Sequence, residues 1–301
     1  MADAARCNEA MSFEVRRLSG SLGAEVRGVA LADVDAAVAE EIRRLLLEHM
    51  VLFFPEQHLT PDEHIAFGRH FGELESHPNL DLRRERPEFF ELRAVDGGGG
   101  IADEWHSDLS CAPTPSVLSI LQAKVVPEVG GDTMWTNTCR AYEELSAPLR
   151  DLCDGLTAYH DAGPHLAPDK GYIHPVVRVH PETGRRALFV NEHFTRRIVE
   201  LSDVESTALL ALLTRWVQQP RFTVRYRWTA GTIAMWDNRC TQHHVLNDFV
   251  GERVIQRVTV MGDAPQPAVP LPRWEPSVST TATFWRDDAV RRQLKAQRAT
   301  D

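Results

Sequence analysis

The chain has 301 residues, of which 43% are hydrophobic and 25% charged, a composition typical of a globular protein with a substantial core. Its formal net charge of -10 and its pI near 5.7 leave no basic excess to neutralise phosphates, so nucleic acids and anionic membranes are poor partners. The five cysteines have no CxxC spacing, which predicts free thiols. The sequence shows no apolar N-terminal segment and no apolar run of membrane length, and with the free thiols this predicts a cytoplasmic location.

The first part of the chain predicts strands and helices in alternation. Residues 12–31 alternate apolar and polar side chains around several glycines, which indicates two short strands joined by a turn. Apolar residues at helical spacing follow over 35–49, and a buried strand is expected over 51–54. Thr60-Pro-Asp-Glu63 is typical of a capping box with proline in the first turn, so a helix should begin there and end near Gly72.

From about residue 89 the chain changes to short apolar runs separated by turn residues, which favours an antiparallel sandwich or barrel. Two helices should interrupt these strands, over 137–156 and 202–218, and His180-Pro-Glu-Thr-Gly184 predicts a hairpin turn. Because neither an internal repeat nor a linker is visible, we expect a single domain over 12–265 with tails at 1–11 and 266–301.

One candidate metal-ligand pair is His106 and Asp108, which one residue separates. In a strand this spacing directs both side chains to the same face. Alone the pair is a weak signal, because 13 histidines and 43 acidic residues in 301 give about two His-x-acid pairs by chance, and the chain has two. We interpret the second pair, His180 and Glu182, as part of a turn, and the first could equally be a surface histidine beside an acid.

A third ligand is available in Trp236-Asp-Asn-Arg-Cys-Thr-Gln-His243. Neighbouring residues of a strand point to opposite faces, so only one of His243 and His244 can face inward. Two histidines and one carboxylate leave three octahedral positions on iron(II) for a bidentate 2-oxo acid and dioxygen. A zinc site with the same ligands remains an alternative.

Two arginines follow at strand spacing in Arg253-Val-Ile-Gln-Arg257, which places both on one side of a strand. Guanidinium groups inside a barrel need anions to pair with. A dicarboxylate cofactor and an anionic substrate would supply them, although internal carboxylates could also do so. The arginines therefore favour an iron oxygenase that binds a 2-oxo acid.

Several segments together resemble the taurine dioxygenase (TauD/TfdA) family of iron(II)- and 2-oxoglutarate-dependent oxygenases, and the similarity extends from about residue 12 to about residue 265. The matching segments are Trp105 to Asp108, Gly130 to Asn137, Ala187 to Glu192 with Phe194 to Ile198, Trp236 to His243, and Arg253 to Thr259 with Gly262 and Asp263. The resemblance implies a mainly β protein with helices, of the α+β class: a double-stranded β-helix, or cupin-like jelly-roll barrel, with an N-terminal βα segment and inserted helices.

The resemblance also implies roles for individual residues. His106, Asp108 and His243 would hold iron(II), with no catalytic residue beyond these ligands, and dioxygen would be the oxidant. Arg253 would bind 2-oxoglutarate, with Thr133 adding a hydrogen bond. The loop between His243 and Arg253 is one residue shorter than in taurine dioxygenases, so the assignment of cofactor and substrate between Arg253 and Arg257 stays open.

For the substrate, the resemblance implies that His77 and Arg257 bind a sulfonate and that Phe194 forms an apolar wall. Leu80 and Ala102 occupy the positions that hold taurine's amine in the family, and neither can bind an ammonium group. We therefore expect a sulfonate or alkyl sulfate to be hydroxylated, with release of sulfite or sulfate, succinate and carbon dioxide. The alternatives are a non-sulfur acid such as a phenoxyalkanoate, a cupin-like metal hydrolase or isomerase, and a non-catalytic binding protein. We expect a homodimer or homotetramer.

Overall fold

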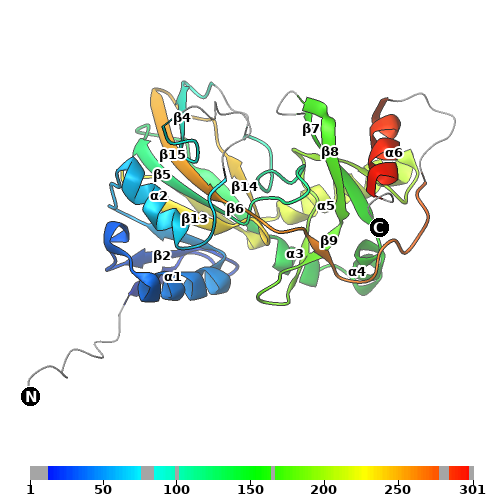
Figure 1. Cartoon of the computed structure of the whole chain (residues 1–301), viewed down its shortest axis with the longest axis horizontal. Helices are drawn as coiled ribbons and strands as arrows, with labels where there is room; N and C mark the ends of the chain where they lie inside the picture. The colour runs from blue at the N-terminus through cyan, green and yellow to red at the C-terminus, as the bar shows by residue number, and fades with distance from the viewer. Residues whose placement is uncertain (1–12, 76–84, 99–101, 164–166, 278–284, 298–301) are drawn as a thin grey trace, which may run out of the picture.

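The structure is a computed structural model that describes residues 13–75, 85–98, 102–163, 167–277 and 285–297. A large mixed sheet, with helices α1 and α2 and with β6 and β14 beside it, forms one half of the molecule, and β7, β8 and β9 with helices α3 to α6 form the other (Figure 1). The two halves are not separate in sequence, because β13 and β15 of the large sheet follow most of the second half along the chain.

The large sheet has seven strands, and only β2 and β3 run parallel. The predicted pair of short strands at the start of the chain is confirmed as an antiparallel hairpin of β1 and β2. In spatial order the strands are β1 (Glu14–Arg17), β2 (Ala24–Arg27), β3 (Val51–Phe54), β13 (Ile233–Asp237), β5 (Leu118–Val125), β15 (Glu252–Val260) and β4 (Phe90–Val95).

Helices α1 (Ala36–His49) and α2 (Pro61–Arg69) begin at the residues that the sequence predicts. The Asp35 side chain accepts a hydrogen bond from the backbone of Val38 at 2.9 Å and caps α1. The capping box of α2 is complete, since Glu63 accepts from the Thr60 backbone at 2.7 Å and donates its own amide to the Thr60 hydroxyl. This helix ends at Arg69, before the predicted Gly72, because residues 70 and 71 form i to i−3 hydrogen bonds that tighten the last turn.

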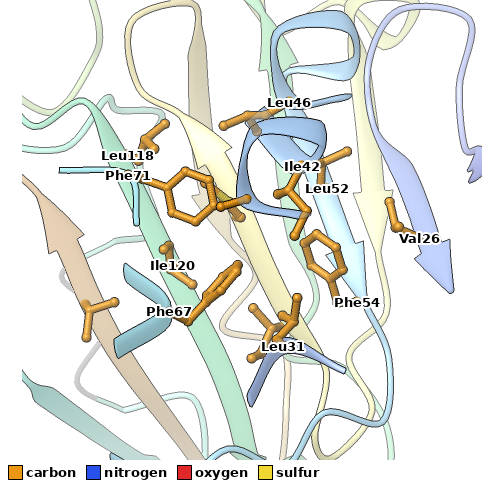
Figure 2. Packing of buried hydrophobic residues seen from close by; sticks show 14 of the residues in the cluster. Val26, Leu31, Ile42, Leu46, Leu52, Phe54, Phe67, Phe71, Leu118 and Ile120 are labelled. Carbon is orange, nitrogen blue, oxygen red and sulfur yellow. The ribbon is translucent and has the colours of Figure 1, made fainter. Parts of the chain in front are cut away.

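The main core lies between α1, α2 and one face of the large sheet, where Ile42 and Phe67 of the two helices meet Ile120 of β5 (Figure 2). Strand β3 is buried on both faces, which explains its unbroken apolar sequence. Leu52 and Phe54 pack into this core, whereas Val51 and Phe53 point to the opposite side. There they join a second cluster that contains Trp135, Trp228, Trp236 and Ile255.

Three smaller sheets of three strands each complete the described strands. The predicted turn at His180 is confirmed as the connection between β9 and β10, with the Gly184 amide bonded to the His180 carbonyl at 2.9 Å. The sheets are β12 (Thr223–Tyr226), β6 (Thr133–Asn137) and β14 (Thr241–Val245); β11 (Thr195–Ile198), β7 (Thr157–Ala162) and β8 (Ala167–Pro175); and β10 (Arg186–Leu188), β9 (Val177–Val179) and β16 (Gln266–Pro267).

The single helix predicted over 137–156 is wrong, because the structure has two helices there. α3 (Thr138–Glu143) ends before Ser146, and α4 (Ala147–Asp154) begins with Pro148 in its first turn. Proline lacks the amide that a continuous helix requires and is tolerated only near a helix start. The predicted helix over 202–218 is confirmed as α5 (Asp203–Val217), and two short 3-10 turns span Leu31–Asp33 and Pro220–Phe222.

The stretch after residue 265, which the sequence sets apart as a tail, contributes β16 and helix α6 (Trp285–Gln297) to the packed structure. Ala289 and Val290 of α6 are buried against Tyr159, Ile173 and Val199. Sheets and helices together make a mixed α/β fold. Within the described ranges, no helix combines the length and the apolar character needed to cross a bilayer.

Candidate active site

His106, Asp108 and His243 come together in one buried group, and their ligand atoms all lie within 4.8 Å of one another. His243 belongs to β14, and its backbone forms two hydrogen bonds with His106, at 2.8 and 3.1 Å. The two imidazole rings are consequently 4.1 Å apart between centroids. Asp108 does not continue a strand as the His-x-Asp spacing suggested: it opens a turn, and its carboxylate lies 3.9 Å from His106 Nε2.

The two histidines of this group are prepared to act as neutral ligands. His106 Nδ1 donates to the Glu104 carbonyl at 2.7 Å, which leaves Nε2 with its lone pair directed toward Asp108. Burial lowers the pKa of His106 to about 4, and burial together with the nearby His106 ring lowers the pKa of His243 far below its usual value. The neighbouring His244 instead packs beside the Trp105 ring and is not part of the group.

The Asp108 carboxylate is held by residues from two strands of the large sheet. Its Oδ2 accepts from the Ser119 hydroxyl of β5 at 2.7 Å and lies 3.0 Å from Arg257 Nη2 of β15. Asn238 accepts from the Asp108 amide at 3.3 Å and donates to Ser119 at 3.0 Å. Burial alone would raise the pKa of Asp108, but Arg257 and the two histidines hold it well below its usual range, so the group stays an anionic ligand.

Arg253 is buried, and neither its Nε nor its Nη2 has a hydrogen-bond partner among the described residues. Burial lowers the pKa of this guanidinium to about 10. A buried arginine without a counter-ion is costly, and a bidentate carboxylate would satisfy both nitrogens. Gly131 lies against Arg253 Cδ, so the backbone approaches the arginine closely there.

Thr133, the second expected cofactor residue, is buried on β6 two residues from Trp135, whose strand partner is His243. Its hydroxyl oxygen accepts from Trp228 Nε1 at 3.0 Å, so the hydroxyl hydrogen is free to donate to a further acceptor. Trp135 and Ile255 belong to the same apolar cluster, and Ile255 lies between the two arginines on β15. Thr133 and Arg253 therefore border one interior region.

The expected substrate residues are only partly within the described ranges. Arg257 donates through Nε to Thr259 at 2.9 Å and through Nη2 to Ser119 at 3.3 Å, beside the ligand group. Phe194 is buried with its ring 6.3 Å from that of His106. Ala102 is half-buried and accepts from the Val245 amide at 2.9 Å, at the end of β14. His77 and Leu80 lie outside the described residues.

Several residues that the sequence analysis did not single out complete the surroundings. Ser119 and Asn238 bind Asp108, and His193 lies with its ring 5.2 Å from that of His106 while its Nδ1 bonds Glu104 at 2.9 Å. Asn238 lies inside a quoted motif and His193 lies between two quoted segments, so both could have been considered there. Ser119 carries no signal in sequence, because only the pairing of β5 with β13 and β15 brings it to the site.

Two imidazoles and one carboxylate lie on a single buried face, with one arginine beside them and another that has no counter-ion in the described part of the chain. This arrangement defines a mononuclear metal site of the iron oxygenase type with cations available for anions. The model of the family described as taurine catabolism dioxygenase TauD, TfdA family matches residues 14–259. The chain belongs to this family and is an oxidoreductase, a 2-oxoglutarate-dependent dioxygenase that uses iron(II), 2-oxoglutarate and dioxygen.

Relatives of known name share most of the length of the chain. An alpha-ketoglutarate-dependent sulfate ester dioxygenase of Pseudomonas putida is 38% identical over 279 residues, which cover 85% of this chain and 92% of the relative. An alkylsulfatase of Acinetobacter baylyi is 36% identical, with 85% and 87% covered. The crystal structure of a taurine dioxygenase from Burkholderia xenovorans superposes with a TM-score of 0.77 at 40% identity and covers 85% of this chain and 93% of its own.

Proposed function

We propose that this dioxygenase hydroxylates a small alkyl sulfate or sulfonate and thereby releases sulfate or sulfite. The observation that carries the proposal is the presence of two arginines on either side of Ile255, one beside the ligand group and one without a partner among the described residues. Two separate cations match two separate anions, the cofactor and the substrate. Sequence relatives named as a sulfate ester dioxygenase and an alkylsulfatase support the same class of substrate.

His106 Nε2, Asp108 and His243 would hold iron(II) in this proposal, and Arg253 with Thr133 would bind the distal carboxylate of 2-oxoglutarate. Bound iron, cofactor and dioxygen together supply an oxidative decarboxylation that is coupled to hydroxylation of a C–H bond. Asp108 keeps its charge because Ser119 and Arg257 bind it, and the Glu104 carbonyl fixes the orientation of His106. The chain's own contribution is therefore ligand orientation and anion binding.

On the substrate side, Arg257 and His77 would bind the anionic head group, and Phe194 would exclude water from the carbon to be hydroxylated. Ala102 and Leu80 offer no acceptor for an ammonium group, which favours substrates with an apolar body over taurine. Hydroxylation of the carbon that bears the sulfate oxygen gives a hemiacetal ester, which separates into an aldehyde and sulfate. The corresponding sulfonate gives an aldehyde and sulfite.

Four further proposals concern the whole molecule. We propose that the strands assemble into a double-stranded β-helix, with the β12-β6-β14 sheet and part of the large sheet as its two walls, which the ordering of the strands supports. We propose one catalytic domain over 12–265, to which β16 and α6 add contacts. Four described cysteines are free thiols, which supports a cytoplasmic location, and a homodimer or homotetramer is proposed for the assembly.

The test is anaerobic reconstitution with iron(II) and 2-oxoglutarate, followed by a panel of alkyl sulfates, alkyl sulfonates, taurine and a phenoxyalkanoate. Succinate formation reports turnover, and sulfate or sulfite reports cleavage. We expect an alkyl sulfate or alkyl sulfonate to give the highest kcat/KM. If taurine were clearly preferred, the argument from Ala102 and Leu80 would fail, and a preference for the phenoxyalkanoate would overturn the sulfur-containing substrate class.

A further inference from the structure

Glu75 lies beside the arginine that the proposed function assigns to the substrate. The backbone amide of Glu75 donates to the Thr259 carbonyl at 2.8 Å, and the preceding residue, Leu74, pairs with Val260. Thr259 in turn accepts from Arg257 Nε through its hydroxyl oxygen. The short segment that carries Glu75 is thus fixed along the end of β15, next to Arg257.

The Glu75 side chain is half-buried and is held by a hydrogen bond. Its Oε2 accepts from the Ser116 hydroxyl at 2.9 Å, and the carboxyl is within electrostatic reach of both Arg257 and Asp108. Burial raises the pKa of Glu75, the nearby Asp108 adds to this rise, and Ser116 and Arg257 oppose it. One guanidinium therefore lies among two carboxylates, of which Asp108 already contacts it at 3.0 Å.

This arrangement limits how much additional negative charge Arg257 can neutralise. A sulfate ester or a sulfonate brings one negative charge, whereas a phosphate monoester brings nearly two at neutral pH. Each charge on the head group is repelled by the Glu75 carboxylate, so the unfavourable energy grows in proportion to the charge of the ligand. The two kinds of head group are otherwise similar, since both are tetrahedral and both present three terminal oxygens.

We propose that Glu75 is a specificity-determining residue that restricts the substrate site to singly charged head groups and rejects phosphate monoesters. The inference rests on the proposed function, because it takes Arg257 as the receptor for the substrate anion. It adds a reason for selectivity between ligands of the same shape, which contacts with the arginine alone would not provide. Specificity of this kind depends on a repulsive element as much as on an attractive one.

The experiment compares an alkyl sulfate with the alkyl phosphate of the same chain length at pH 8, in the iron- and 2-oxoglutarate-loaded enzyme. The KM of the sulfate is measured from succinate formation, and the Ki of the phosphate from competitive inhibition of that reaction. Glu75→Gln removes the charge but keeps an oxygen that can accept from Ser116. Glu73→Gln is the matched control, because Glu73 is two residues away and exposed.

We expect the wild-type enzyme to bind the phosphate more weakly than the sulfate. In Glu75→Gln the ratio of phosphate Ki to sulfate KM should fall about fivefold. This is the size expected when the repulsion between the Glu75 carboxylate and the second negative charge of the phosphate, partly screened by solvent, is removed. Glu73→Gln should leave the ratio unchanged. An unchanged ratio in Glu75→Gln with normal turnover of the sulfate would overturn this inference and leave the proposed function standing. No 2-oxoglutarate-dependent turnover of alkyl sulfates or sulfonates in the wild type would overturn both.

Discussion

Within the described residues, two buried groups present a carboxylate and a histidine at metal-binding distances, and they differ in how the carboxylate is neutralised. The first is His106, Asp108 and His243, and the second is His180, Asp237 and Cys240. Both are fully buried, and both place their ligand atoms within 4.8 Å of one another. Distance and burial alone therefore do not distinguish a metal site from an internal polar cluster.

In the second group every ligand is already satisfied. Arg239 binds Asp237 through two nitrogens, at 2.6 and 2.9 Å, and the same arginine also pairs with Glu182. His180 donates to Asp237 at 2.9 Å and accepts from two backbone amides. A hydrogen bond with Cys139 and burial raise the pKa of Cys240 far above its usual value, so its thiol stays protonated and is a poor ligand.

The first group keeps unused binding capacity. His243 Nδ1, beside Asp108, and two nitrogens of the nearby Arg253 lack partners among the described residues. Buried polar groups of native proteins are normally satisfied, so such an excess indicates a ligand. Between these two groups, therefore, unsatisfied polar atoms distinguish the functional site, and the spacing of the ligand atoms does not.

Asp108→Ala should abolish turnover, with a loss of more than about 1000-fold, which exceeds the tenfold to 100-fold usual for outer-shell residues. The fold should survive, because Arg257 keeps its bonds to Ser119 and Thr259. Succinate formation and iron binding by the purified variant, with far-ultraviolet circular dichroism as the check on folding, measure the effect. Retained succinate production in this variant would falsify the assignment of Asp108 as a ligand.

Asp237→Ala should show the opposite pattern. The substitution leaves Arg239 and His180 buried without their acceptor, so the free energy of unfolding should fall by about 3–5 kcal/mol. The folded fraction should still bind iron, because no ligand of the first group is removed. Denaturant unfolding measures the free energy of unfolding, and iron bound per folded molecule measures whether the first group is intact. If Asp237→Ala left stability unchanged but removed a bound metal, the second group would be a metal site after all.

The sequence predicted local structure well where a single short motif decides it. The capping boxes at Thr60 and Ser202 and the turn at His180 all give the predicted element. It failed at Pro148, where helical spacing on both sides suggested one helix and the missing amide separates two. The overall class was predictable from alternating runs, but the order of seven strands was not, because it depends on pairings between distant segments.

At the site, the quoted motifs contain His106, Asp108 and His243, and the structure brings these three together. The sequence offered no way to see that Ser119 binds Asp108 or that Glu75 lies beside Arg257. The first contact depends on the strand pairing of β5, and the second on the pairing of Leu74 with Val260 at the end of β15. The sequence could not predict the charge balance of the second group either. Asp237 and Arg239 are near neighbours in sequence, but only burial makes their contact decisive.

The two arginines allow a second comparison within the site. Arg253→Leu should raise the KM for 2-oxoglutarate by about 100-fold, because two charge-assisted hydrogen bonds are lost. Without cofactor the variant should be at least as stable as the wild type, since the guanidinium has no counter-ion among the described residues. Arg257→Leu should instead raise the KM for the substrate. The two KM values, measured in both variants, decide the assignment, and a reversed pattern would exchange the roles of the arginines.

The smallest expected effect concerns His64, which is as buried as the two groups above but has no carboxylate partner in the ranges that the structure describes. Its Nε2 bonds the Ile120 carbonyl at 3.1 Å, and burial lowers its pKa to about 4. Below pH 6.5 the unfolded chain takes up a proton that the folded chain does not, so this histidine reduces stability as pH falls toward 4, by at most about 3 kcal/mol. Above pH 6.5 it contributes nothing to the pH dependence.

His64→Leu should therefore weaken the loss of stability between pH 6.5 and 4, with other buried histidines contributing equally to both proteins. Denaturant unfolding of the metal-free enzyme at several pH values measures the slope, and the exposed His70→Leu controls for the loss of a surface imidazole. An unchanged slope in His64→Leu would mean that the buried imidazole is charged in the folded protein. Burial without a counter-charge would then not be enough to keep the His64 imidazole neutral.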